Sequence, residues 1–227
     1  VRTDLGPSGA VDRRPYPLPH RTGVGMRVYD LFCGAGGFSA GFHMAGHHIV
    51  GGVDADADSV ATFADAHPDS RADVSDVEDV DGKAVVRRHG ELDVLLGGPP
   101  CQGFSFYNHK RGSHDPRTAL VREYLRLVEE VRPSWLVMEN VTGMAEASGG
   151  QVVDDVHAAL AASGYDSRHA VLKAENYGVP QMRRRVFFVA SARGMGAFRW
   201  PEPTHGPEAG RPHVTVGEAI MDLPEIE

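Results

Sequence analysis

Apolar positions along the chain fall into runs of two kinds, separated by polar turns. Short runs rich in β-branched and aromatic residues predict strands at residues 26–32, 47–54, 72–74, 92–98, 134–141, 167–174 and 185–192. Longer segments with apolar residues three or four positions apart predict helices at residues 38–46, 58–67, 118–133 and 151–164. Strands that alternate with helices predict an α/β fold with a doubly wound, mostly parallel sheet.

The regular pattern does not cover the two ends of the chain. Residues 1–25 carry several prolines and glycines without an apolar period, which predicts a flexible leader. Residues 26–195 form the regular domain, and residues 196–227 are expected to be a linker that leads into a short helix. The capping-box pattern from Thr215 to Glu218 marks the start of that helix.

Composition narrows the classes of function. The chain has 227 residues and a net charge of −8, which argues against a large nucleic-acid-binding surface on these residues alone. Arg87 and Arg88 are expected to be solvated surface residues. Only two cysteines occur, Cys33 and Cys101. We therefore predict neither a disulfide framework nor a metal site, and we expect the protein to reside in a reducing compartment.

Three glycines follow the first predicted strand. Gly34, Gly36 and Gly37 allow a tight turn that opens a helix with free backbone amides. Such a turn alone is a weak signal, because an ordinary tight turn has the same composition. Asp54 and Asp73 end the next two strands, where carboxylates can bind the ribose and the amino group of a nucleoside. Together these residues predict a nucleoside cofactor.

The segment GGPPCQGFS places Cys101 directly after the predicted strand at 92–98. In a parallel sheet this loop lies at the same edge as the glycine turn, where ligands bind. A lone cysteine is usually a small buried residue. Pro99 and Pro100 argue against that interpretation, because they stiffen the exit of a strand rather than fill a core.

Four segments in this order resemble motifs of the DNA cytosine-5 methyltransferase family: DLFCGAGGFS, GGPPCQGFS, MENV and QMRRRVFFVA. The segment DPRTAL, between the second and third of them, is also similar to the family. The resemblance extends from about residue 26 to the end of the chain. It implies a Rossmann-like, S-adenosylmethionine-dependent fold, with residues 26–195 as the catalytic domain.

The resemblance also implies a covalent mechanism. Cys101 would attack C6 of a cytosine in DNA, which makes C5 able to accept a methyl group. Glu139 would deliver a proton to N3. Of Arg183 and Arg185, one would bind the cytosine O2 and the other would steady the cysteine loop, which Asn140 would also hold. The target base must leave the helical stack to reach the thiol, so base flipping is implied.

By the same resemblance, further residues would contact the cofactor and DNA. S-adenosylmethionine, with S-adenosylhomocysteine as the product, would be bound by Phe32, Gly34, Gly36, Gly37, Asp54, Asp73, Val74, Pro100 and Leu120. DNA would be contacted by Gln102, Ser105 and Arg117.

The sequence departs from the family after VTVGEAIMDLP. The family continues with a target-recognition region and a final segment that closes the cofactor pocket. We therefore expect a split enzyme whose second polypeptide carries these parts, or a fragment, or a degenerate relative. The joint presence of Cys101, Glu139 and the arginine pair favours the first two. Ala55 also stands where the family often has a large apolar residue.

Two other functions stay open. A tRNA cytosine-5 methyltransferase is disfavoured because that subgroup tends to carry threonine at the position of Ser105. A non-catalytic subunit could keep the fold to bind S-adenosylmethionine or a partner within a modification system. For the enzyme, we expect a cytoplasmic, nucleoid-associated location in a prokaryote. The sequence does not decide whether a restriction nuclease accompanies it.

Overall fold

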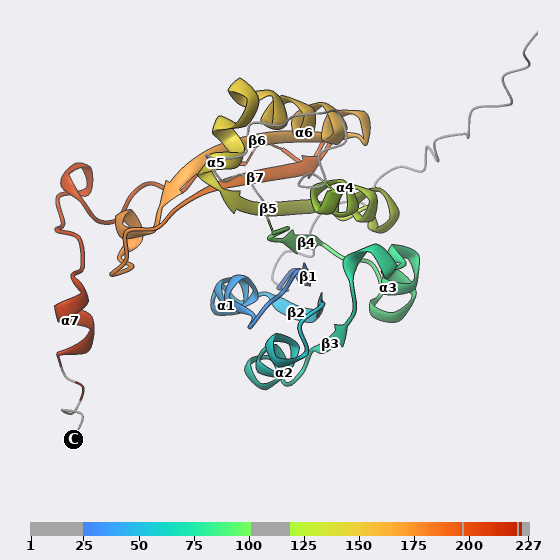
Figure 1. Ribbon diagram of the computed structural model, residues 1–227, viewed down its shortest axis with the longest axis horizontal. Coiled ribbons are helices and arrows are strands. Elements are labelled where there is room, and N and C mark those ends of the chain that lie inside the picture. Colours follow the sequence, from blue (N-terminus) through green and yellow to red (C-terminus); the bar gives the residue numbers. More distant parts are fainter. Residues whose placement is uncertain (1–24, 101–118, 197, 222, 224–227) are drawn as a thin grey trace, which may run out of the picture.

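The computed structural model describes residues 25–100, 119–196, 198–221 and 223, and is built on one seven-stranded sheet (Figure 1). The strand order is β3-β2-β1-β4-β5-β7-β6. The strands are β1 (Arg27–Leu31), β2 (His48–Asp54), β3 (Arg71–Val74), β4 (Val94–Gly97), β5 (Trp135–Val141), β6 (Tyr165–Lys173) and β7 (Arg184–Ala192). β7 alone runs in the opposite direction to the other strands, which confirms the predicted mostly parallel α/β sheet.

Helices cover both faces of the sheet (Figure 1). They are α1 (Gly37–Met44), α2 (Ala57–Ala66), α3 (Gly82–His89), α4 (Ala119–Val131), α5 (Thr142–Glu146), α6 (Gln151–Ala162) and α7 (Val216–Ile220). A large core joins the sheet to α4 and α6, and a smaller core on the other face includes Phe63 of α2 with Phe38 and Phe42 of α1. In the described ranges, no helix is long and apolar enough to cross a membrane.

Local sequence signals set several helix boundaries. The Asp56 side chain caps α2 by accepting a hydrogen bond from the Ser59 N–H at 2.9 Å. The same helix ends before Pro68, as predicted, because the residue before a proline avoids the helical conformation. The predicted capping box at Thr215 and Glu218 is present and opens α7.

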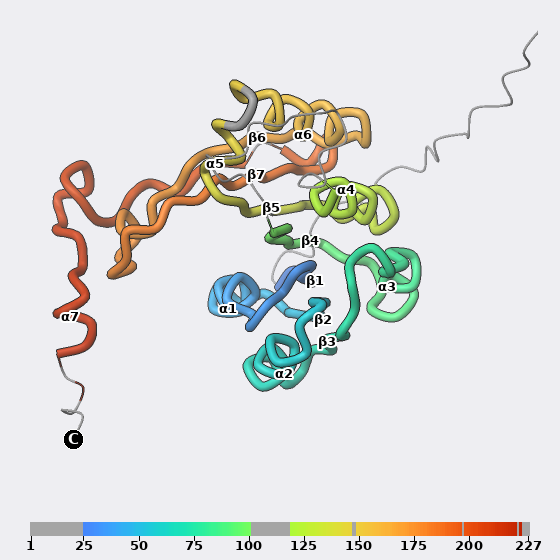
Figure 2. The backbone as a smooth tube through the Cα atoms, viewed as in Figure 1, coloured from blue at the N-terminus to red at the C-terminus, as the bar shows by residue number. Residues whose placement is uncertain are grey.

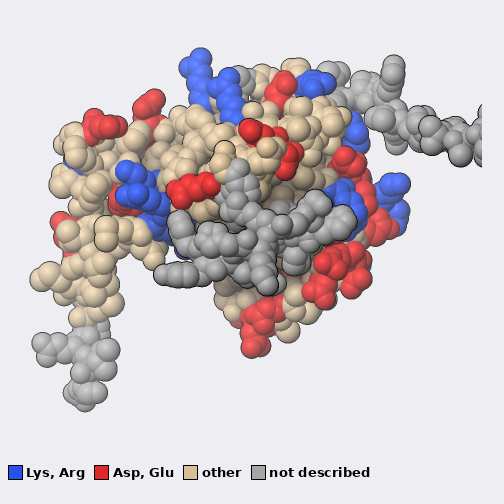
Figure 3. Space-filling model, turned by 45° about the horizontal axis from the view of Figure 1, so that its top comes forward, with Lys and Arg blue, Asp and Glu red and all other residues tan. Residues whose placement is uncertain are grey.

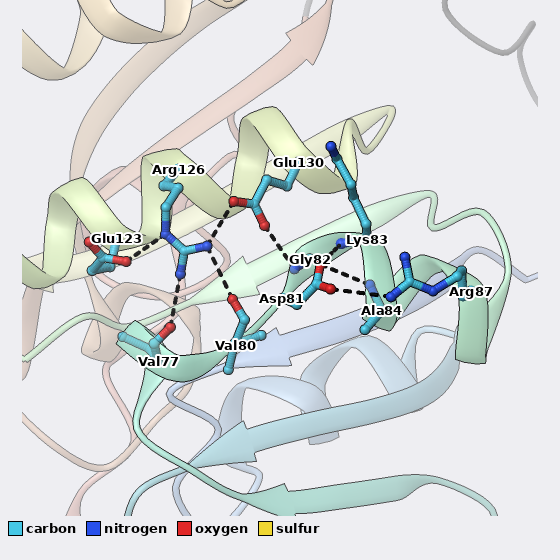
Figure 4. A network of polar contacts seen from close by, with 10 residues as sticks. All are labelled: Val77, Val80, Asp81, Gly82, Lys83, Ala84, Arg87, Glu123, Arg126 and Glu130. Carbon is cyan, nitrogen blue, oxygen red and sulfur yellow. Dashed lines mark hydrogen bonds and ion pairs between the residues drawn. The ribbon is translucent and has the colours of Figure 1, made fainter.

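Helix α3 is not among the predicted helices. Its eight residues contain few apolar positions, and only Gly82 and Val85 are buried. The signal for its start is Asp81, whose carboxylate accepts hydrogen bonds from the N–H groups of Lys83 and Ala84, at 2.8 and 3.1 Å. A charged network joins the start of α3 to α4 through Arg126 (Figure 4).

The reversed direction of β7 matters for the site. It brings the beginning of β7 to the carboxyl end of β5, where Arg185 pairs with Val141 in the sheet. Strands β6 and β7 extend as a hairpin beyond the body, and the chain then continues to α7, which lies away from the sheet (Figure 2). The carboxyl ends of β1, β2, β4 and β5 therefore meet the start of β7 at one edge.

Candidate active site

The glycine turn at the end of β1 has an unusual backbone. Gly34 and Gly36 have φ angles of 51° and 87°, and Phe32 has a φ of 60°. A bulky residue in this left-handed region is strained, and such strain is commonly found at ligand sites. A Cβ on Gly34 or Gly37 would meet no atom of the described residues within 4 Å, so with respect to these residues the turn faces open space. This leaves room for a ligand to approach the backbone.

Asp54, at the end of β2, holds this turn. Its Oδ2 accepts a hydrogen bond from the Gly34 N–H at 2.9 Å, and its Oδ1 accepts one from the Asp56 N–H at 3.0 Å. Asp54 is predicted from the sequence to bind ribose, whereas this internal role is not predicted. Each carboxylate oxygen can accept more than one hydrogen bond, so both functions are compatible.

Val74 and Asp73 have different surroundings although they are neighbours. Val74 pairs with Asp54 in the sheet and is 56% exposed, which makes it an apolar surface beside the carboxylate. Asp73 forms an ion pair with Arg88 of α3, with 2.7 Å between Oδ2 and Nη1. Arg71 lies at 3.8 Å from the other oxygen. The carboxylate expected to bind adenine is thus already paired. Arg88 is exposed, as expected, and also forms this ion pair.

Close packing at the end of β4 accounts for Gly97, the first of the two glycines before Cys101. A Cβ on Gly97 would lie 2.5 Å from the Tyr124 ring of α4, so only glycine fits there. The Asn140 side chain is buried and donates to the Pro99 carbonyl at 3.0 Å, so it holds the start of the loop as expected. Pro100 is exposed.

The remaining predicted contacts belong either to α4 or to residues 101–118. Leu120, at the start of α4, is partly buried and packs against the large core. Cys101, Gln102, Ser105 and Arg117 lie outside the described residues.

Glu139, near the end of β5, is the centre of a charged group. Its Oε1 lies 2.9 Å from Arg185 Nε and 3.3 Å from Arg183 Nη2. Its Oε2 would be 3.8 Å from a Cβ on Gly98. The two arginines share a face, as alternate residues of an extended segment should. Their direct contact with Glu139 is not predicted from the sequence, because the family resemblance implies that one binds the base and the other steadies the cysteine loop.

Asp30, in β1, belongs to the site region but was not predicted. It is 1% exposed, and Ser39 of α1 donates a hydrogen bond from its Oγ to Asp30 Oδ2 at 2.6 Å. Burial raises the pKa of Asp30 to about 7. Its only sequence signal is a carboxylate inside an apolar strand, next to the glycine turn.

Two further features complete the description of the site. Among the described residues, no three His, Cys, Asp or Glu side chains are placed to hold a metal ion. A hollow of about 780 Å³ lies at the opposite edge of the sheet, near the amino ends of the strands. Its lining includes His48, His67 and Arg88 but none of the predicted site residues.

Comparison with known sequences points to one family. The family model of the C-5 cytosine-specific DNA methylase matches residues 26–226. Type II methyltransferase M.AgeI from Thalassovita gelatinovora is 39% identical over 222 residues, covering 88% of this chain and 51% of that protein. Type II methyltransferase M.AquIA from Picosynechococcus sp. is 35% identical over 221 residues, covering 87% of this chain and 89% of that protein. The chain thus spans about half the length of M.AgeI but most of M.AquIA.

The fold comparison agrees. A crystal structure from E. coli, of a candidate DNA modification methyltransferase encoded within a prophage, has a TM-score of 0.72 and 29% identity. The match covers 88% of this chain and 56% of that one. This similarity confirms the Rossmann-like methyltransferase fold. The chain belongs to the C-5 cytosine-specific DNA methylase family.

Proposed function

We propose that this chain transfers a methyl group from S-adenosylmethionine to C5 of a flipped cytosine in DNA, through a covalent adduct on Cys101. The observation that carries the proposal is the position of Glu139. Its carboxylate lies beside Gly98, and the neighbouring Asn140 holds Pro99, only two residues before Cys101. A thiol and a carboxylate near one another are what the reaction on cytosine needs.

The residues around the glycine turn fit a nucleoside cofactor. Asp54 can accept hydrogen bonds from ribose hydroxyls, and the exposed Val74 beside it can contact the adenine ring. The open space at Gly34 and Gly37 suits the close approach of the amino-acid part. When bound, S-adenosylmethionine supplies an electrophilic methyl group.

The chain's own side chains account for the remaining steps. The Cys101 thiolate forms a bond to C6 while a proton passes through Glu139 to N3, so that electron density moves to C5. After C5 has gained the methyl group, its own proton leaves to water, the bond between sulfur and C6 breaks to restore the thiolate, and N3 returns its proton to Glu139. Arg183 and Arg185 hold Glu139 before the base arrives, and on binding one of them turns to the cytosine O2.

The recognition of a DNA sequence requires parts that we assign to a second polypeptide. That chain would carry the target-recognition region and the segment that closes the cofactor pocket. M.AquIA supports this arrangement, because a curated type II methyltransferase of nearly this length exists. The apolar side chains of α7 also support it, since Val216 and Ile220 are 58% and 52% exposed.

The test is covalent trapping on duplex DNA that contains 5-fluorocytosine, because the fluorine cannot leave and the adduct persists. The chain is mixed with S-adenosylmethionine and the product of the neighbouring reading frame, and the adduct is measured by denaturing electrophoresis. We expect an adduct with the native chain and none with Cys101→Ala. Cys33→Ala, which changes the buried cysteine, is the control and should still form it.

Other outcomes would separate the alternatives. Trapping on 5-fluorocytosine tRNA but not on DNA would assign the chain to RNA. Methyl transfer to DNA that survives Cys101→Ala would exclude the covalent mechanism. If neither nucleic acid is trapped with the partner present, the chain is a non-catalytic subunit.

A further inference from the structure

The end of α2 packs directly behind the glycine turn. Phe63 and His67 are four residues apart and therefore lie on the same face of the helix. Pro68 ends the helix there, so that His67 is its C-cap residue. Phe63 is fully buried and His67 is 6% exposed. Their rings form a wall against which the turn rests.

Gly36 contacts this wall closely. A Cβ on Gly36 would lie 3.0 Å from Phe63 Cδ2 and 3.1 Å from His67 Nε2. The Gly36 carbonyl is the first acceptor of α1 and receives the Ala40 N–H at 2.8 Å. His67 Nε2 lies 3.5 Å from the same oxygen. The carbonyl that starts α1 therefore has both the Ala40 N–H and His67 Nε2 within hydrogen-bond distance.

His67 is itself held in place. Its backbone N–H donates to the Phe63 carbonyl at 2.9 Å, and its own carbonyl accepts from the N–H and the hydroxyl of Ser70, at 2.9 and 2.7 Å. The imidazole packs against the rings of Phe63 and His43, with centroids 4.8 and 5.9 Å away. Because both its backbone and its ring are restrained, His67 can hold the carbonyl that its ring contacts.

We propose that His67 is a positioning residue for S-adenosylmethionine. A carbonyl oxygen only accepts, so the contact requires a proton on His67 Nε2. This donor orients the Gly36 carbonyl, and with it the free amides at the start of α1 that face the open side of the turn. The inference rests on the proposed function, since S-adenosylmethionine is the ligand that the turn would bind.

The first test needs no cofactor. Long-range ¹H–¹⁵N spectra of the full chain should show a proton on His67 Nε2. The turn should also lose protection in His67→Phe, which keeps an aromatic ring but removes the donor. We expect faster hydrogen exchange in a peptide that spans residues 33–40. A proton on Nδ1 alone, or unchanged exchange in His67→Phe, would overturn the proposal.

The second test measures affinity for S-adenosylmethionine by isothermal titration calorimetry. His67→Phe should weaken binding about three- to tenfold, the size expected for one hydrogen bond. His67→Gln, which can place an amide N–H near the same point, should recover most of the affinity. His48→Phe is the control. His48 lines the same 780 Å³ hollow as His67 but does not contact the turn, so this variant should bind S-adenosylmethionine with native affinity.

The outcomes separate the two proposals. If the native chain binds S-adenosylmethionine and His67→Phe binds equally well, the role of His67 is wrong and the proposed function stands. Weak binding by both Phe and Gln variants would indicate a packing role, which also overturns the inference. If the native chain does not bind, the proposed function fails for this chain alone, and the tautomer and exchange measurements still decide the role of His67.

Discussion

Single side chains at this site combine support of the backbone with chemistry. Asp54 holds the glycine turn with both carboxylate oxygens and still has lone pairs for a ligand. Glu139 is bracketed by two arginines through one oxygen, while its other oxygen is directed toward Gly98. A substitution at either position will therefore alter the geometry of the site as well as remove a functional group.

Asp30 gives a prediction about pH. Burial raises its pKa to about 7, so the folded chain keeps a proton that the unfolded chain releases near pH 4. Stability is therefore lost as pH rises from about 4 to 7. Asp30→Asn cannot ionise and keeps an acceptor for Ser39. Between pH 5 and 8 its unfolding free energy should rise relative to the native chain by about 2–3 kcal/mol.

Urea denaturation at several pH values measures this difference. Asp56→Asn is the control, because Asp56 is exposed and its hydrogen bond from Ser59 lowers its pKa below that range. It should leave the pH dependence between 5 and 8 unchanged. Parallel stability curves for Asp30→Asn and the native chain would show that Asp30 is ionised in the folded state.

At the scale of elements, contacts between distant segments define the site. The Arg126 guanidinium of α4 donates to the Val77 and Val80 carbonyls, both at 3.1 Å. It also pairs with Glu123 and Glu130, at 2.6 and 2.8 Å. Glu130 in turn accepts the Gly82 N–H at the start of α3 (Figure 4). This network fixes the connection from β3 to α3, and α3 supplies the Arg88 that pairs with Asp73.

Arg126→Met should test the network, because methionine keeps an apolar stem but loses every donor. We expect destabilisation by about 1–3 kcal/mol, since two carbonyls and two glutamates lose their partner. Arg87→Gln is the matched control. Arg87 pairs with Asp81 at 3.2 Å but is 67% exposed, so its loss should change stability by less than about 0.5 kcal/mol. Urea midpoints that shift equally in both variants would contradict a special role for Arg126.

These elements also show what the sequence alone can predict. The strands, four of the helices and the start of α7 follow from local periodicity, from Pro68 and from the Thr215 capping box. Helices α3 and α5 are not predicted, because α3 has a short apolar pattern and α5 has only five residues. The turn, Glu139 and the arginines follow from motifs. Their mutual contacts, like that of His67 with Gly36, depend on packing between segments that no local pattern relates.

At the scale of the molecule, charge is distributed unevenly. Acidic residues crowd residues 54–81, and red side chains gather over the part that carries α2, β3 and α3 (Figure 3). Blue side chains group near the outer end of the hairpin of β6 and β7, where Lys173 and Arg184 are opposite each other in the two strands. Arg183 and Arg185, on either side of Arg184, also contact Glu139. DNA should therefore approach from the hairpin side, away from the acidic half.

Replacing both Lys173 and Arg184 with glutamine should weaken binding of duplex DNA of any sequence. Each cation that neutralises a phosphate releases about 0.9 of a counterion, so the slope of log K against log salt should become shallower by about two. Fluorescence anisotropy from low to moderate salt measures the slope. The matched double variant Arg87→Gln and Lys83→Gln removes equal charge from α3 and should keep the native slope. An equal loss of slope in both would mean that net charge, and not the hairpin, governs the encounter with DNA.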